Sequence, residues 1–133
     1  MNPSQLITEE ISLYDFNTTV EMLVIEADHK GWKVPMVHDL QHTLAKAGKT
    51  VAPVTVIEIC KPTFSGKILE LNNERMISVM MPCRISVYEK EDGKTYISLL
   101  NSGNLTEGMP ETVINVMTSA ANETFEIVKS VIL

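Results

Sequence analysis

Residues 83–100 read CRISVYEKEDGKTYISLL, and this stretch decides the fold. Its first half alternates the apolar Ile85 and Val87 with polar neighbours, which is the pattern of a half-buried strand. The Glu-Asp-Gly-Lys sequence at 91–94 predicts a tight hairpin turn, because an Asp-Gly pair tolerates the positive φ angles of such turns. Residues 95–100 then form the return strand, so these two strands are expected to be antiparallel.

Outward from this hairpin, the remaining segments show strand and helix patterns in turn. Asp15 and Asn17 are good helix starters, Thr18 and Glu21 have the spacing of a capping box, and Gly31 stands where a glycine commonly ends a helix. We expect strands at 11–13, 32–37, 53–60, 76–90 with an interruption at Pro82, and 95–100, and helices at 17–30, 39–47, 62–71 and from Pro110 onward.

This order predicts an α+β fold in which helices pack on one face of a mostly antiparallel sheet. The chain has 133 residues and a mass of 14.8 kDa, which is the size of one ordinary domain. No internal repeat and no linker divides it, so residues 1–133 are expected to form a single domain.

Composition and charge exclude several classes of protein. The net charge is −6 and the 11 lysines and arginines never form a run, which argues against nucleic-acid binding. Apolar stretches are too short and too interrupted for a membrane-spanning helix. The N-terminal residues lack the basic and apolar regions of a secretory signal, so we expect a cytoplasmic protein with reduced thiols.

Cys60 is the sharpest candidate for chemistry. It ends a predicted strand directly before a helix that begins near Pro62, and the positive end of that helix would favour a thiolate. The alternative is that Cys60 is simply a small buried apolar residue, a common fate of cysteine. The second cysteine, Cys83, follows Pro82, and a proline within a strand implies an edge or a bulge.

Glu58 lies two residues before Cys60 in an otherwise apolar strand, where an unpaired carboxylate would be costly. One interpretation is a structural ion pair with Arg84 on the adjacent strand; the other is a role in the site. His38 precedes Asp39, which is expected to cap the next helix, so His38 lies just outside that helix and is a candidate ligand.

Methionine is frequent, with eight residues in the chain, and Met76, Met80 and Met81 cluster just before Cys83. Thioethers and thiolates are both soft ligands, suited to ions such as Cu(I). Such methionines more often fill gaps in a core or form the seam of a dimer, and we favour the seam.

Three stretches of the chain resemble one known family. They are WKVPMVHDLQHTLAKAGK at 32–49, VAPVTVIEICKP at 51–62 and MMPCRISVYEKEDGKTYISLLN at 80–101. Their most specific elements are the His-Asp pair, the Glu-x-Cys motif and the Met-Pro-Cys-Arg run, and together they resemble the family of domain of unknown function 302.

The resemblance implies a TATA-binding-protein-like fold, with a strand, a helix, four strands and a final helix, small extra helices, and often a homodimer. It implies no established activity. Lys61 stands where family members usually have Asn, and a lysine there would either favour a thiolate at the preceding cysteine or be solvated. The family's motif positions in this chain are His38, Glu58, Cys60, Cys83 and Arg84.

Three hypotheses about function follow. The first is a homodimeric ligand- or metal-binding module, in which His38, Cys60 and Cys83 hold zinc or another thiophilic ion, with Asp39, Glu58 and Arg84 as further candidate ligand-binding residues. The second is a thiol-dependent enzyme or redox protein that uses Cys60 as nucleophile and His38 as base. The third is a structural or interaction domain in which the cysteines are merely packed.

Overall fold

The predicted hairpin lies at the heart of the sheet. In the computed structural model, which describes residues 6–132, β4 (Cys83–Glu89) and β5 (Thr95–Leu100) pair in antiparallel register. Gly93 in the connecting turn has a φ of +79°, a left-handed conformation that glycine adopts without steric cost. The sheet order is β1-β5-β4-β3-β2, with β1 at Ile7–Ile11, β3 at Val54–Cys60 and β2 at Lys33–Asp39.

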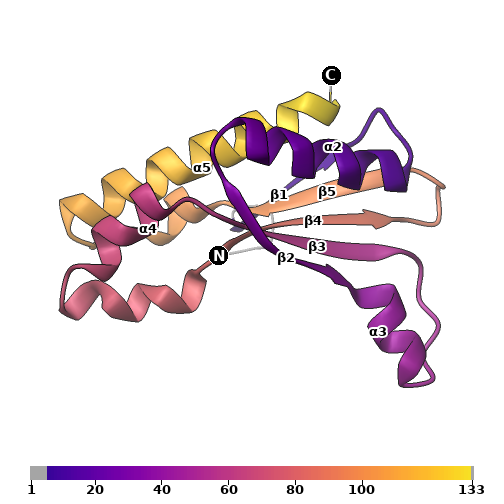
Figure 1. The fold of residues 1–133 in the computed structure, drawn as a ribbon, viewed down its shortest axis with the longest axis horizontal. Helices are drawn as coiled ribbons and strands as arrows, with labels where there is room; N and C mark the ends of the chain where they lie inside the picture. The colour runs from indigo at the N-terminus through magenta and orange to yellow at the C-terminus, as the bar shows by residue number, and fades with distance from the viewer. Residues whose placement is uncertain (1–5, 133) are drawn as a thin grey trace.

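All four neighbouring strand pairs are antiparallel, and the main helices cover one face of the sheet (Figure 1). The long α5 (Glu111–Ile132) and α2 (Phe16–His29) lie on that face, and α4 (Pro62–Leu69) packs beside α5. This arrangement confirms the predicted α+β fold. The main core contains Leu23, Ala27, Ile57, Ile59, Ile85, Val87, Ile97, Ile127, Val128 and Val131.

Local capping explains where two helices begin. The Asp15 carboxylate accepts a hydrogen bond from the backbone N–H of Thr18 at 2.8 Å, so Asp15 is the N-cap of α2. In the same way, the Asp39 carboxylate accepts from the N–H of His42 at 3.0 Å and begins the short α3 (Leu40–Lys46). Gly31, with a φ of +81°, follows α2 where a terminal glycine was predicted.

Two predicted strands differ from the structure. The first strand covers Ile7–Ile11 and not 11–13, and it lies at the edge of the sheet beside β5. Residues before Pro82 are not extended: η1 (Asn73–Met80) is a 3₁₀ helix. The reason is that, among the described residues, no strand pairs with residues 73–80. β3 ends at Cys60, and its pairing with β4 extends only as far as Cys83.

Pro82 therefore lies just outside β4 and not within it, so the edge or bulge that it was expected to mark is absent there. β4 is an inner strand of the sheet, between β5 and β3. A short 3₁₀ helix, η2 (Ser102–Leu105), connects β5 to α5 and lies against α5. Pro35 lies in β2 at the outer edge of the sheet, where a proline is tolerated.

Candidate functional site

The sheet places His38 and Glu58, two of the predicted site residues, beside each other on the face opposite the helices. Ile57 and Ile59 of β3 are fully buried against the helices, so the alternation of a strand turns Glu58 to the other face. There, His38 Nε2 lies 2.8 Å from Glu58 Oε2. The carboxylate that was expected to be costly in an apolar strand is thus paired with an imidazole from β2.

Arg84 is not the partner of Glu58. The two residues are directly opposite each other in the register of β3 and β4. Nevertheless, no ion pair joins them, and the side chain of Arg84 makes no hydrogen bond within residues 6–132. The predicted structural pair is therefore wrong, because β2 brings His38 within hydrogen-bonding distance of the same carboxylate. Asp39 has a separate task, since its carboxylate caps α3.

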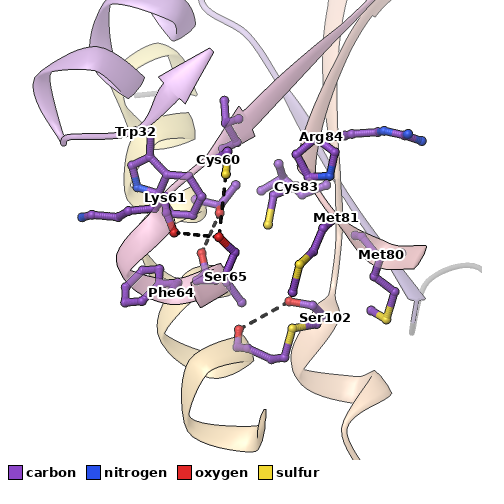
Figure 2. A pocket seen from close by; sticks show the side chains of 18 of the residues that line it. Trp32, Cys60, Lys61, Phe64, Ser65, Met80, Met81, Cys83, Arg84 and Ser102 are labelled. Carbon is purple, nitrogen blue, oxygen red and sulfur yellow. Dashed lines mark hydrogen bonds between the residues drawn. The ribbon is translucent and has the colours of Figure 1, made fainter. Parts of the chain in front are cut away.

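Both cysteines line a cavity of about 500 Å³ (Figure 2). It lies where the end of β3 and the start of β4 meet α4, the end of η1 and the first half of α5. Its lining is mainly apolar, and its polar groups are few. The residues that line it include Trp32, Ile59, Cys60, Lys61, Phe64, Ser65, Ile68, Met80, Met81, Cys83, Arg84, Ser102, Val116, Met117, Ala120, Ala121 and Thr124.

The two thiols are free and half-buried. Cys60 Sγ lies 3.8 Å from the hydroxyl oxygen of Ser65, one turn into α4. Burial raises the pKa of the Cys83 thiol above its ordinary value, and the neighbouring Cys60 raises this pKa further. Cys83 is therefore a protonated thiol at neutral pH.

One wall of the cavity is held by a hydrogen-bonded and aromatic cluster. Glu123 Oε1 on α5 accepts from Lys61 Nζ at 2.6 Å and from Trp32 Nε1 at 3.1 Å. The Lys61 ammonium also lies 5.4 Å from the centre of the Phe64 ring and donates to the carbonyl of Lys30. The lysine is thus partnered and not simply solvated, and it links α5 to the end of β3.

Sequence reasoning singled out the two cysteines, Arg84, Lys61, Met80 and Met81 but missed most of the remaining lining. Trp32, Phe64 and Ser65 read as ordinary strand and helix residues. A signal was present only for Ser65, because it lies five residues after Cys60 in the first turns of a helix that begins beside that cysteine.

The predicted metal set of Cys60, Cys83 and His38 is not assembled. His38 does not line the cavity; it is hydrogen-bonded to Glu58 on the face of the sheet away from the helices. Over the part of the chain that the structure describes, no group of three or more His, Cys, Asp or Glu side chains could hold a metal ion. Structural zinc sites are almost always four-coordinate, so these residues do not form one.

Comparison with known proteins places this fold in a family. A five-stranded antiparallel sheet, helices on one face and a Cys-lined cavity at the end of the sheet describe a small α+β domain. The model of the family "Domain of unknown function DUF302" matches residues 7–132, so the chain belongs to that family. The resemblance inferred from the sequence motifs is confirmed.

Two relatives illustrate the range of this similarity. An uncharacterised protein of Aquifex aeolicus (strain VF5) is 33% identical over 72 residues, which are 54% of this chain and 46% of that protein. The chain thus matches about half the length of this relative. The crystal structure of an uncharacterised conserved DUF302 protein from Bacillus stearothermophilus superimposes with a TM-score of 0.83 at 18% identity, over 93% of this chain and 96% of the other. That likeness shows the shared fold.

The length and hydropathy of a helix decide whether it can cross a membrane. None of the helices among the described residues is long and apolar enough to cross a bilayer.

Proposed function

We propose that this protein is a ligand-binding module and that the cavity beside Cys60 and Cys83 is its binding site. The observation that carries the proposal is the cavity itself, whose volume of about 500 Å³ falls in the range of small-molecule sites. Its mainly apolar lining carries a few polar groups, among them the two thiols and the Ser65 hydroxyl. Such a lining favours a small, largely apolar ligand that is oriented by these groups.

Of the predicted ligand-binding residues, three border this cavity: Cys60, Cys83 and Arg84. The guanidinium of Arg84 extends outward from the group of labelled side chains in Figure 2, so it belongs to the rim. Glu58 and His38 satisfy each other on the sheet and do not line the cavity. The proposed site is therefore smaller than the predicted one, and it consists of sulfur, hydroxyl and apolar groups.

The experiment uses Trp32, the single tryptophan of the chain, as a reporter in the cavity wall. We expect saturable binding of the apolar dye anilinonaphthalene sulfonate, detected by energy transfer from Trp32. The variant Ala121→Leu adds bulk to the α5 side of the cavity and should weaken dye binding by about tenfold. The matched control is Ala45→Leu, at an exposed position of α3 outside the cavity.

The proposal is overturned if the dye shows no saturable binding, or if Ala121→Leu and Ala45→Leu bind it equally well. Thermal unfolding of both variants checks that each is folded at the temperature of the titration. A variant that stays folded and loses the dye supports the cavity as the site.

Thiol chemistry at Cys60 is the second candidate function. Two observations favour it: Cys60 borders the cavity directly before α4, and its sulfur lies against the Ser65 hydroxyl. A reactive Cys60 would be alkylated at neutral pH in the folded protein, and Cys60→Ser would abolish that reaction while Cys83→Ser would retain it. If both cysteines react only after denaturation, this function is wrong.

A homodimer remains part of the proposal, and η1 is the surface that supports it. The side chains of Met76 and Val79 on this 3₁₀ helix are 75% and 87% exposed, an unusual cost for large apolar groups. A second copy of the chain would bury them, which also fits the alternative of an interaction domain. Light scattering should show a dimer that Val79→Glu converts to a monomer; a monomer at high concentration of the parent chain would contradict it.

A further inference from the structure

The cavity contains an unusual set of potential metal donors. Its lining includes five sulfur-bearing side chains and no His, Asp or Glu. Oxygen donors from side chains are limited to hydroxyl groups, which are poor ligands while they keep their protons. The sulfur-bearing residues are Cys60, Cys83, Met80, Met81 and Met117.

Three of these residues lie near one end of the sheet. Cys83 is paired with Ile59, the neighbour of Cys60, so the two cysteines come from adjacent strand ends. Met81 lies two residues before Cys83, in the segment between η1 and β4. Figure 2 shows the sulfur ends of Cys60, Cys83 and Met81 turned toward the same space, with Met80 farther out.

Donor chemistry identifies the kind of ion that such a group selects. Thiolates and thioethers are soft ligands that favour Cu(I), whereas imidazole and carboxylate donors, absent from this lining, suit harder ions. Zinc sites commonly complete four ligands with nitrogen or oxygen, and the cavity offers only two thiols. The same lining that disfavours zinc therefore suits a soft monovalent ion.

We propose that the sulfur-lined wall of this cavity is a Cu(I) site, with the thiolates of Cys60 and Cys83 and the thioether of Met81 as ligands. The inference rests on the proposed function, because it adds an ion site on the sulfur-lined wall of the same cavity that would bind the apolar ligand. Each cysteine releases its proton to solvent when its sulfur bonds to copper, and no electron is transferred, because the ion enters and stays as Cu(I). The resulting site carries one negative charge, near the N-terminus of α4, where a helix favours anions.

The test is an anaerobic titration of the reduced protein with Cu(I) held by the coloured chelator bicinchoninate. We expect one Cu(I) per chain to move from the chelator to the protein. Cys60→Ser and Cys83→Ser should each weaken Cu(I) binding by at least about a hundredfold, more than loss of an outer-shell partner costs a metal site. Met81→Leu should cause a smaller loss, and Met76→Leu, an exposed position outside the cavity, should cause none.

The inference is overturned if either single-cysteine variant retains the parent affinity, because the thiols then bind copper independently. It is also overturned if Zn²⁺, measured by competition with a zinc-sensitive dye, binds as tightly as Cu(I). Energy transfer from Trp32 to bound anilinonaphthalene sulfonate distinguishes a failure of the copper site from a failure of the proposed function. Dye binding without Cu(I) binding refutes the copper site alone, whereas failure of both removes the cavity as a binding site.

Discussion

Replacing Glu123 by alanine should destabilise the protein more than the loss of an ordinary surface glutamate. Glu123 Oε1 accepts two hydrogen bonds, from Lys61 Nζ at 2.6 Å and from Trp32 Nε1 at 3.1 Å. These bonds connect α5 to Lys61, directly after β3, and to Trp32, directly before β2. The side chains of Lys61 and Glu123 are 22% and 36% exposed, so water screens the pair only in part.

The magnitude follows from these contacts. A neutral hydrogen bond contributes about 1 kcal/mol net and one to a charged group about 1.5–3 kcal/mol. Since the Glu123 carboxylate is more than a third exposed, solvent reduces the stabilisation from its ion pair with Lys61 to that of a partly screened pair. We therefore expect Glu123→Ala to lower the free energy of unfolding by about 2 kcal/mol. For a chain of this size, that loss corresponds to a fall in Tm of roughly 8 °C.

Urea unfolding, followed both by Trp32 fluorescence and by far-ultraviolet circular dichroism, measures this loss. The matched control is Glu126→Ala on the same helix. Glu126 also pairs with a lysine, Lys129, at 2.9 Å, but both side chains are more than half exposed. Its loss should cost less than about 0.5 kcal/mol. Equal free energies of unfolding for the two variants would refute the reasoning, and Glu123→Gln should fall between Glu123→Ala and the parent chain because it keeps an acceptor for Trp32.

Three further predictions concern the backbone, the thiols and alkaline pH. Gly31→Ala should lower the free energy of unfolding by about 1–2 kcal/mol, because the φ of Gly31 is +81°. Gly66→Ala, within α4, should raise the free energy of unfolding by about 0.5–1 kcal/mol. Urea unfolding in which both substitutions change this free energy in the same direction would contradict the reasoning. In the folded protein, Cys83 should be alkylated more slowly than Cys60 near neutral pH, because burial raises its pKa, and mass spectrometry of the labelled protein would show the opposite order if this is wrong. Burial, together with the hydrogen bond to Glu9, raises the pKa of Tyr88 from 10.0 to about 12. The stability that the protonated Tyr88 phenol contributes is therefore complete below the unfolded pKa and is lost as pH rises through the folded pKa. Tyr88→Phe should remove that part of the alkaline loss, and a spectrophotometric titration in which all three tyrosines ionise together near 10.0 would count against it.

Local signals explain which parts of the fold could be predicted. The Asp-Gly turn, the capping carboxylates of Asp15 and Asp39 and the terminal Gly31 act over a few residues, and each lies where the sequence placed it. The alternation that turns Glu58 away from the buried face of β3 is also a local property of the strand. For these features the chemistry of neighbouring residues is sufficient.

Pairing across the sheet explains the errors. Residues before Pro82 have a strand-like composition but no partner strand, so they form η1 instead. Glu58 had two neighbours that could neutralise it, and only the arrangement of β2 beside β3 selected His38 over Arg84. That selection also removed His38 from the predicted metal set.

The amino-acid sequence by itself determined the order of the helices and strands, the antiparallel hairpin and the family, because turns, caps and periodic apolar positions depend on residues close together in the chain. Only the tertiary structure decided that Cys60 and Cys83 share a cavity with Trp32, Met81 and α5. The physical reason is that a cavity exists only once distant segments have packed, and the shape of that packing is a property of the whole core.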